Sequence, residues 1–260
     1  MKKLIFLDLD GTLWNFEQIP SSALEAIECA RKNGHKVFTN TGRSKCEVPQ
    51  LLWDLHLDGY CFSAGSEIFL NNQQVLYKPL DKRSVLWIQH IGKSIGYSLE
   101  GSEMTFSNEK NRERMRQFHV DNRMGNRFLS FPDISTMTEK DYAQIMKVSI
   151  HFDSIEQKEL LLNQMPENLI FTSFMHLGGE ITLKEYNKAT AIEFVKNEFD
   201  EPYETVAMGD SENDLTMLEY ADISIAMGNG FDVVKEKADY VTDTIDNDGL
   251  YKAFKHLKLF

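Results

Sequence analysis

The fold is decided by residues 3–12, which read KLIFLDLDGT. The apolar run at 4–7 leads directly into Asp8, and Asp10 and Gly11 follow. A buried strand that ends in two carboxylates is costly unless a cation or hydrogen bonds compensate their charge. Gly11 lets the chain leave the strand sharply, and open α/β sheets bind ligands at the carboxyl ends of their strands. The stretch predicts a strand that delivers carboxylates to a ligand site; the alternative is a structural Asp-Gly turn.

Length, charge and cysteine content narrow the class of protein. The chain has 260 residues, of which 42% are apolar, and a formal net charge of −12. This length suffices for one large domain or two modest ones, and the acidic balance argues against nucleic acid or an anionic membrane as partner. Cys29, Cys46 and Cys61 have no metal-ligand spacing and make a poor disulfide framework. Because Asp8 and Asp10 interrupt the apolar start before a signal peptide develops, we expect a cytoplasmic protein.

Strand and helix patterns alternate at both ends of the chain. Ser22 and Glu25 read as the capping box of a helix, and a strand follows at 36–38. Further strands are predicted at 60–62, 66–70, 74–77, 205–208, 223–227 and 240–242. Units of this β-α-β kind predict a parallel sheet with right-handed crossovers.

The middle of the chain lacks this alternation. Residues 147–152 read as a strand, 155–165 as an amphipathic helix, and 170–174 with 180–183 as a strand pair. We therefore predict an α/β fold with a doubly wound, mostly parallel core at 1–80 and 183–260. An α+β domain at 81–182 is inserted between the two halves of that core.

Polar residues follow several of the predicted core strands. The carboxyl ends of parallel strands converge on one crevice, so we expect these side chains to lie together. Carboxylate and amide oxygens suit Mg²⁺, which typically takes one or two carboxylates plus water and substrate phosphate. A lysine and a hydroxyl beside such a metal suit the charge of a phosphoryl group in transit. The residues concerned are Asp8, Asp10, Thr41, Lys188, Asp210, Asn213 and Asp214.

These segments resemble the four motifs of the haloacid dehalogenase superfamily: DLDGT at 8–12, TGR at 41–43, Lys188, and GDSEND at 209–214. Their order and the place of the insertion resemble the Cof-type phosphatases, whose α+β cap lies between the second and third motifs. Phosphatases and phosphomutases of this family have the second aspartate, whereas its dehalogenases do not. The resemblance implies a Mg²⁺-dependent hydrolase of a small phosphorylated metabolite.

The resemblance also implies catalytic roles. Asp8 is expected to attack phosphorus and form an aspartyl-phosphate, which divides one hard displacement into two easier ones. Asp10 is expected to protonate the leaving oxygen and then to activate water. Thr41, with Gly42, is expected to bind the phosphoryl oxygens, and Lys188 to neutralise them and orient Asp8.

A metal site follows from the same resemblance. The Asp8 carboxylate, the Asp10 backbone carbonyl and Asp210 are expected to hold Mg²⁺, with Asn213 or Asp214 nearby. Asp214 also suits the first turn of a helix, where the helix dipole favours an acidic side chain, and Asn213 also suits a role in tying down the loop.

Two assignments have competitors close by. Thr39 competes with Thr41, although Thr41 precedes the Gly-Arg pair that resembles the family motif. Lys184 competes with Lys188, although Lys188 opens an apolar-periodic helix. We therefore prefer Thr41 and Lys188.

The chain departs from the Cof-type pattern in places that concern the substrate. The sequence SAG at 63–65 stands where an Asn-Gly pair is common, and GNG at 228–230 replaces Gly-Asn-Ala. Basic residues of the middle domain, at 110–116 with Arg123 and Arg127, suit either an anionic substrate or a solvated helix face.

Three functions are compatible with these residues. The leading one is hydrolysis of a small phosphomonoester, such as a sugar phosphate or a phosphorylated cofactor. A phosphomutase uses the same pair of aspartates but exchanges phosphate between positions without net release of inorganic phosphate. The third is a catalytically silent protein that binds a phosphorylated metabolite, and the presence of every catalytic position counts against it.

Overall fold

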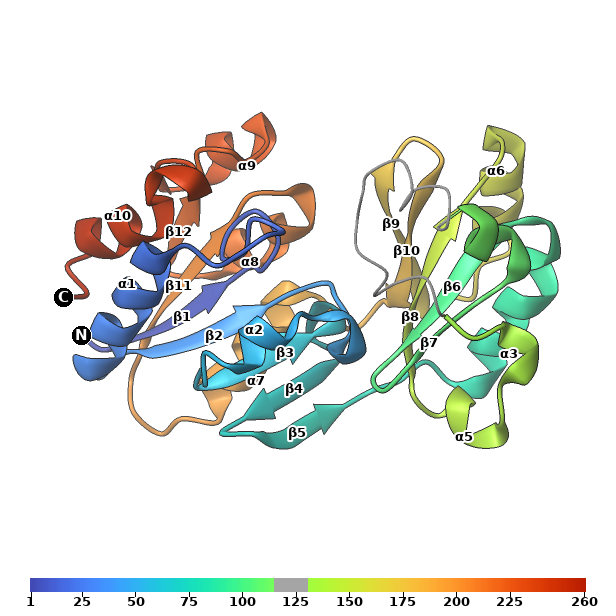
Figure 1. Cartoon of the computed structure of the whole chain (residues 1–260), viewed down its shortest axis with the longest axis horizontal. Helices are drawn as coiled ribbons and strands as arrows, with labels where there is room; N and C mark the ends of the chain where they lie inside the picture. Colours follow the sequence, from blue (N-terminus) through green and yellow to red (C-terminus); the bar gives the residue numbers. More distant parts are fainter. Residues whose placement is uncertain (115–130) are drawn as a thin grey trace. The chain divides into compact units, whose positions relative to one another are not determined.

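The computed structural model describes residues 1–114 and 131–260 and consists of two compact units (Figure 1). The core unit comprises Met1–Arg43, Val48–Tyr77 and Tyr186–Phe260, and the cap unit comprises Ser44–Glu47 and Lys78–Glu185. The middle domain predicted at 81–182 falls within the range of the cap unit. Among the described residues, no helix has both the length and the apolar character needed to cross a bilayer.

The core unit is built on an eight-stranded sheet in the order β13-β12-β11-β1-β2-β3-β4-β5. Neighbouring strands from β13 to β3 pair in parallel, and β4 and β5 are added antiparallel. The mostly parallel sheet predicted from the sequence is confirmed. The strands are β1 (Lys3–Leu7), β2 (Lys36–Asn40), β3 (Gly59–Phe62), β4 (Glu67–Leu70), β5 (Gln73–Tyr77), β11 (Glu204–Gly209), β12 (Ile223–Ala226) and β13 (Tyr240–Val241).

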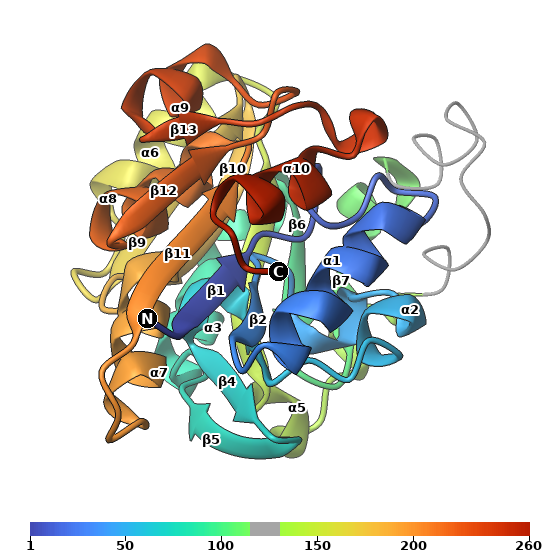
Figure 2. The same ribbon diagram turned by 90° about the vertical axis from the view of Figure 1, so that its left-hand side faces the viewer.

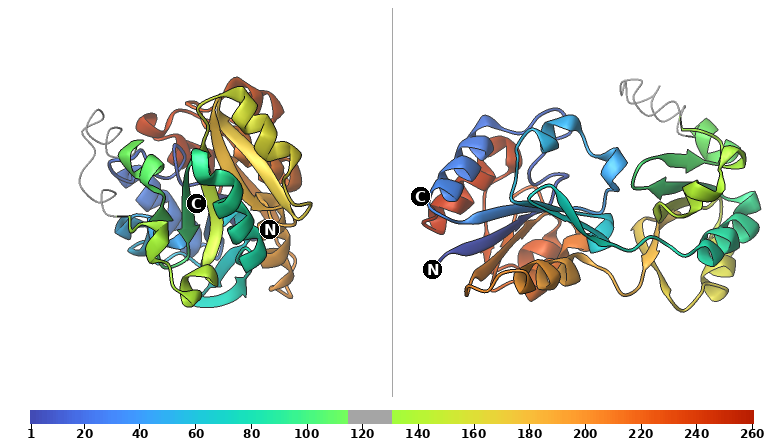
Figure 3. Two further views of the ribbon diagram at one scale, coloured as in Figure 1. Left: turned by 90° about the vertical axis from the view of Figure 1, so that its right-hand side faces the viewer. Right: turned by 90° about the horizontal axis from the view of Figure 1, so that it is seen from below.

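Helices cover both faces of this sheet because its central strands are apolar on both sides. In β1, Ile5 and Leu7 pack on one face, and Leu4 and Phe6 pack on the other. The first face is covered by α1 (Ser21–Lys32) and α10 (Gly249–His256), which lie beside each other (Figure 2). The second is covered by α7 (Lys188–Asn197), α8 (Leu215–Tyr220) and α9 (Asp232–Lys237). Figure 3 (right) shows blue α1 and orange α7 on opposite sides of the core strands.

The predicted start of the first helix is wrong in detail. Helix α1 begins at Ser21, its N-cap position is Pro20, and no side chain caps it. The hydroxyl of Ser22 is buried and has no hydrogen-bond partner within residues 1–114 and 131–260. Because Ser22 lies inside the helix and not at its N-cap position, the capping box at Ser22 and Glu25 does not form.

The cap unit is an antiparallel sheet in the order β7-β6-β8-β10-β9 with helices on one face. Helices α3 (Lys82–Ile91) and α6 (Ile155–Asn163) pack on that face (Figure 3, left), and α5 (Glu139–Tyr142) is a short turn of helix. The strands are β6 (Gly96–Gly101), β7 (Thr105–Ser107), β8 (Ile145–His151), β9 (Leu169–Met175) and β10 (Gly178–Leu183). The strands predicted at 147–152, 170–174 and 180–183 and the helix predicted at 155–165 are confirmed, whereas the sequence did not predict β6 and β7.

Candidate active site

The candidate residues of the core unit lie at the carboxyl ends of adjacent parallel strands. Asp8 directly follows β1, Thr41 follows β2, and Asp210 follows β11. Strand β1 pairs with β2 on one side and β11 on the other, and the Asp8 amide continues the ladder by donating to the Met208 carbonyl at 2.9 Å. The sheet therefore delivers these side chains to one edge, as parallel topology requires.

Lys188 is the cation at the centre of this group. Its Nζ donates to Asp8 Oδ1 at 2.5 Å and to Asp214 Oδ1 at 2.6 Å, and it lies 3.4 Å from Asn213 Oδ1. The side chain is 1% exposed. Although burial alone lowers the pKa of a lysine, the ion pairs with Asp214 and Asp8 raise the pKa of Lys188 above its usual range. Lys188 is therefore a charged group held between two carboxylates.

The backbone at the start of α7 holds Lys188 in place. Asn187 caps the helix through its side chain, which accepts from the Ala189 and Thr190 amides at 2.9 and 3.0 Å. The Asn40 side chain, at the end of β2, donates to the Lys188 carbonyl at 2.8 Å. Capping fixes the direction in which the first helical residues leave the loop. The third expected motif is thus anchored both to its own helix and to the sheet.

Asp214 is fully buried and folds the loop that carries Asp210. Its Oδ2 accepts from the backbone amides of Asp210 and Ser211, both at 2.9 Å, while its Oδ1 accepts from Lys188. Asn213 Oδ1 accepts from the Ser211 hydroxyl at 2.8 Å. Both oxygens of Asp214 therefore already have protein donors. Its contacts support a role in shaping the loop and holding Lys188.

Asp210 lies against the turn that follows β1. Its Oδ1 is 3.5 Å from the Thr12 hydroxyl, and a Cβ atom at Gly11 would lie 2.5 Å from its Oδ2. Gly11 has φ +79°, in the left-handed region. The Asn229 side chain ties this turn down by donating to the Gly11 carbonyl at 2.8 Å and accepting from the Ile245 amide at 2.8 Å.

Negative charge exceeds positive charge in this cluster. Burial, together with the neighbouring Asp214 charge, raises the pKa of Asp8 well above its usual range and that of Asp210 to about 7. Oxygen atoms of Asp8, Asp210 and Asp214 lie within 4.8 Å of one another. Burial and mutual repulsion destabilise the ionised form of these carboxylates, and a bound cation would compensate for this. Their ligand atoms are all oxygens, which fits a hard divalent cation.

Gly11→Ala is expected to weaken metal binding by about 10-fold or more, because the new methyl group displaces Asp210. Left-handed backbone costs an L-residue about 1–2 kcal/mol, so the variant is also destabilised. Gly34→Ala is the matched control, since Gly34 has φ +85° but its added Cβ would meet only the flexible Lys2 side chain, at 3.2 Å. Titration with Mg²⁺ and urea unfolding separate the two effects. Equal metal affinity in both variants would contradict the role given to the Gly11–Asp210 contact.

Thr41 and Thr39 differ in what their hydroxyls do. The Thr39 hydroxyl donates to the Leu7 carbonyl at 3.2 Å, within the sheet. Thr41 lies beyond the end of β2, and its hydroxyl accepts from the Arg43 amide at 3.1 Å. The Thr39 hydroxyl is thus engaged within the sheet, and the phosphate contact expected of Thr41 stays a prediction. Gly42 lies between Thr41 and Arg43 in sequence, and its expected substrate contact also stays a prediction.

Arg43 joins the site through Asp10, although in the sequence it is visible only as the last residue of the TGR motif at 41–43. Its Nε donates to Asp10 Oδ2 at 2.7 Å, and its second guanidinium nitrogen donates to Asp10 Oδ1 at 2.9 Å. The signal was present in the TGR motif. However, a pairing with a residue 33 positions away is not visible from periodicity.

A strained loop after β3 supports the segment that carries Thr41 and Arg43. Ser63 and Ala64 have φ of 50° and 54°, which non-glycine residues rarely adopt. The Ser63 amide donates to the Arg43 carbonyl at 2.8 Å, and the Ala64 amide donates to the Thr41 carbonyl at 3.1 Å. Strain of this kind gathers near functional sites. The SAG segment at 63–65 therefore holds the Thr41–Arg43 segment through backbone hydrogen bonds and not through its side chains.

The basic residues of the cap unit are partly accounted for. Lys110 pairs with Asp153 and donates to the Ser94 carbonyl at 2.8 Å. Arg112 pairs with Glu109 and with Asp133. These pairs favour a charged surface of the cap unit over a ligand site. Residues Arg116, Arg123 and Arg127 of the same expectation lie outside the described residues.

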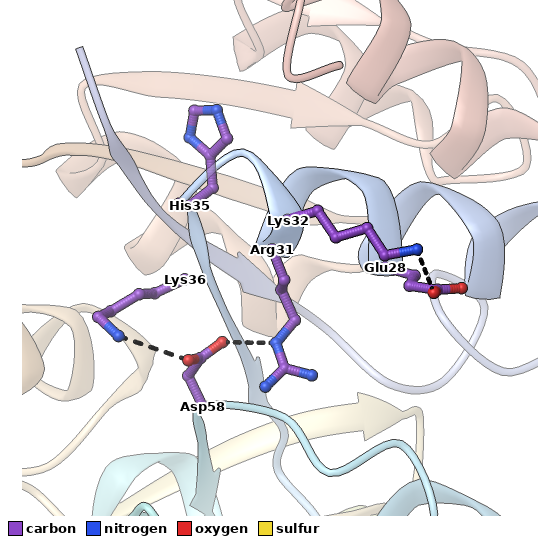
Figure 4. A pocket seen from close by; sticks show the side chains of 7 residues that line it. Glu28, Arg31, Lys32, His35, Lys36 and Asp58 are labelled. Carbon is purple, nitrogen blue, oxygen red and sulfur yellow. Dashed lines mark hydrogen bonds and ion pairs between the residues drawn. The ribbon is translucent and has the colours of Figure 1, made fainter.

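A hollow of about 360 Å³ lies elsewhere in the core unit (Figure 4). Its lining includes Lys36 at the start of β2 and Asp58 just before β3, so it lies at the edge of the sheet opposite to the candidate site. Asp58 pairs with Arg31 at 3.0 Å and with Lys36 at 3.5 Å, while Glu28 pairs with Lys32 at 2.5 Å. Each of its acidic side chains is thus already paired with basic side chains of the same hollow, and we assign it no role in the chemistry.

Comparison with known proteins places the chain in a family. Residues 5–254 match the haloacid dehalogenase-like hydrolases. The chain is 31% identical, over 259 residues, to 5-amino-6-(5-phospho-D-ribitylamino)uracil phosphatase YcsE of Bacillus subtilis; the match covers 98% of this chain and 95% of that protein. It is 28% identical over 264 residues to the putative phosphatase YkrA of the same organism, covering 99% and 98% of the two chains.

Solved structures agree with this placement. The haloalkanoate-superfamily phosphatase BT1666 of Bacteroides thetaiotaomicron superimposes with a TM-score of 0.87 at 26% identity, covering 100% of this chain and 96% of that one. The subclass IIB sugar phosphatase BT4131 superimposes with a TM-score of 0.82 at 26% identity and covers both chains completely. The chain therefore belongs to the haloacid dehalogenase-like hydrolases and is a Cof-type phosphatase of that family.

Proposed function

We propose that this protein is a Mg²⁺-dependent phosphatase that hydrolyses a small phosphomonoester through an aspartyl-phosphate on Asp8. The observation that carries the proposal is the position of Asp8, buried at the end of β1 and in contact with Lys188. A nucleophilic carboxylate needs a cationic partner that keeps it ionised beside an anionic substrate. Lys188 supplies part of that charge from the start of α7, and because burial and the Asp214 charge still raise the pKa of Asp8, a bound Mg²⁺ would supply the rest.

In the first half of the reaction, an Asp8 carboxylate oxygen forms a bond to phosphorus. The bond from phosphorus to the substrate oxygen breaks, and its electron pair stays on that oxygen, which takes a proton from Asp10. Lys188 and the Thr41 hydroxyl stabilise the charge on the phosphoryl oxygens. The products are the free alcohol and the aspartyl-phosphate.

In the second half, a water molecule attacks the aspartyl-phosphate. Asp10, now ionised, accepts a proton from that water, so the acid of the first step is the base of the second. The bond between phosphorus and the Asp8 oxygen breaks, and its electron pair restores the Asp8 carboxylate. Inorganic phosphate leaves, and Asp10 is protonated again for the next cycle.

The Asp8 and Asp210 carboxylates and the Asp10 backbone carbonyl are the residues that would hold Mg²⁺, because their environment favours a compensating cation. When bound, Mg²⁺ supplies charge stabilisation to the phosphoryl oxygens. Asp214 and Asn213 would act indirectly, by holding the loop that carries Asp210. Both oxygens of Asp214 accept hydrogen bonds from protein groups, and Asn213 accepts from the Ser211 hydroxyl.

The names of the relatives favour a phosphorylated sugar or sugar alcohol as substrate. YcsE is named for a substrate with a phosphate on a ribityl chain, and BT4131 is described as a sugar phosphatase. The substrates that these names describe are phosphomonoesters of hydrophilic alcohols. We propose the same class of substrate for this chain.

The test is release of inorganic phosphate from a panel of sugar, sugar-alcohol and cofactor phosphomonoesters, after EDTA treatment and after Mg²⁺ is restored. We expect turnover that falls to the background rate in EDTA and returns with Mg²⁺. Asp210→Asn is expected to need at least about 10-fold more Mg²⁺ for half activation, because it removes a charged ligand. Transfer of phosphate between positions without release would indicate a phosphomutase instead. Substrate binding without either reaction would indicate a silent binding protein.

A further inference from the structure

The pairing of Asp10 with Arg43 has a geometry that goes beyond charge neutralisation. The two nitrogens of the guanidinium fork contact the two oxygens of one carboxylate, at 2.7 and 2.9 Å. Both side chains are half-buried, with 24% of Arg43 and 29% of Asp10 exposed. A bidentate pair fixes the plane of the carboxylate as well as its position, which a lysine does not do.

Arg43 is itself held from several directions. Its backbone amide donates to the Thr41 hydroxyl at 3.1 Å, and its carbonyl accepts from the Ser63 amide at 2.8 Å. The guanidinium lies over the Trp14 ring, 5.3 Å from its centroid. Stacking on an aromatic face restricts a guanidinium that would otherwise sample many rotamers.

Trp14 belongs to the same turn as Asp10. The Gly11 amide donates to the Trp14 carbonyl at 2.9 Å, and the Trp14 amide donates to the Leu9 carbonyl at 2.8 Å. The indole nitrogen of Trp14 is buried and has no hydrogen-bond partner among the described residues. The ring therefore acts through its face and not through its N–H group, and the face is where Arg43 lies.

We propose that Arg43, clamped between Trp14 and Asp10, is the positioning residue that sets the orientation of the Asp10 carboxyl for proton transfer. The proposal rests on the proposed function, in which Asp10 gives a proton to the leaving oxygen and later takes one from water. Proton transfer needs the carboxyl oxygen within hydrogen-bond reach and correctly directed. Each Asp10 oxygen has a second lone-pair direction that remains for this transfer when Arg43 occupies the first.

The proposal predicts an effect that depends on the leaving group. An alkyl phosphate releases an alkoxide that needs a proton, whereas p-nitrophenyl phosphate releases a stable phenolate that does not. The constant kcat/KM covers steps only up to departure of the leaving group, so it isolates the acid role from the later base role. Loss of Arg43 should therefore matter for alkyl substrates and much less for the aryl one.

The experiment measures kcat/KM of Arg43→Gln with glycerol phosphate and with p-nitrophenyl phosphate at saturating Mg²⁺. General acid catalysis is worth about 10²–10⁴-fold, so we expect a loss of about 10²-fold for the alkyl substrate and less than about 10-fold for the aryl one. Trp14→Leu should lower the ratio of kcat/KM for the alkyl substrate to kcat/KM for the aryl substrate in the same direction, by a smaller factor. Arg31→Gln is the matched control, because it breaks an Arg–Asp pair of 3.0 Å far from this turn and should leave the ratio unchanged.

A double-mutant cycle shows whether Arg43 acts through Asp10. In an Asp10→Asn background, Arg43→Gln should cause no further change in the ratio of the two substrates. An equal loss for both substrates in the Arg43 single variant would mean that Arg43 binds the phosphate or only stabilises the fold, and would overturn the proposal. A rise in alkyl activity would also overturn it. If the unmodified protein releases phosphate from neither substrate nor from the wider panel, the proposed function itself fails.

Discussion

Asp8→Asn is expected to lower kcat for phosphate release by at least about 10⁴-fold, because an amide of the same shape is not a nucleophile. The variant keeps the volume of the buried side chain, so the site around it should not collapse. Rapid acid quench of the unmodified protein with substrate, followed by peptide mass spectrometry, should find phosphate on the peptide that contains Asp8. The variant should show none.

The same substitution is expected to raise stability when metal is absent. Burial and the Asp214 charge raise the pKa of Asp8, so the ionised side chain is disfavoured in the fold despite its contact with Lys188. Asparagine removes the charge, and Lys188 keeps Asp214 as its partner at 2.6 Å. In EDTA at neutral pH, Asp8→Asn should therefore have the higher melting temperature.

The two results together identify the function of Asp8, since a structural aspartate would lose stability along with activity. Asp58→Asn provides the comparison, because Asp58 bridges Arg31 and Lys36 away from the site. It should lower stability while kcat changes little. Activity of Asp8→Asn within about 100-fold of the unmodified protein would place the nucleophile elsewhere.

The core sheet was predictable because parallel strands that are covered on both faces read as continuous apolar runs. The run at 4–7 leads directly into Asp8, and the strand at 205–208 leads through Gly209 to Asp210, so the same pattern indicates both the strand and the position of the site. The antiparallel extension was also visible, because Asn71 and Asn72 mark the turn between β4 and β5 and both have positive φ.

The cap sheet was predicted less completely because one of its faces is polar although largely buried. In β6, Tyr97 and Leu99 face the apolar core, and Ser98 and Glu100 alternate with them. Glu100 lies 3.1 Å from Lys147 on β8, an ion pair between strands that sequence alone does not connect. The alternation in β6 spans only Tyr97 and Leu99 between two glycines, which is too short a signal to identify a strand within the polar stretch around it.

The site residues that the sequence predicted are those with a local signature. Asp8, Thr41, Lys188 and Asp210 each stand at the end of a strand or the start of a helix, which periodicity locates. The contacts between them were not predictable, because they depend on tertiary approach. Lys188 is expected from the sequence to orient Asp8, whereas Asp214 is expected near the metal or in the first turn of a helix, so its ion pair with Lys188 is a contact that only the structure reveals.

Lys188→Met is expected to reduce both activity and stability by large factors. Methionine has a similar length but no charge, so the phosphoryl oxygens lose their cationic partner and kcat/KM should fall by about 10²–10³-fold. Asp8 and Asp214 each lose a buried ion pair, at 2.5 and 2.6 Å. Removing one partner of a buried pair costs about 3–5 kcal/mol, which should appear as a lower free energy of unfolding in EDTA.

Lys184→Met is the matched control, because Lys184 is the competing lysine four residues earlier and its side chain is exposed. Surface substitutions usually change stability by less than about 0.5 kcal/mol, so this variant should match the unmodified protein in both measurements. Mg²⁺ should restore more stability to Lys188→Met than to the control, since the uncompensated carboxylates then attract the cation more strongly. If Lys188→Met were as stable in EDTA as the control, the buried charges would be balanced by groups other than Lys188, and its central place in the site would be wrong.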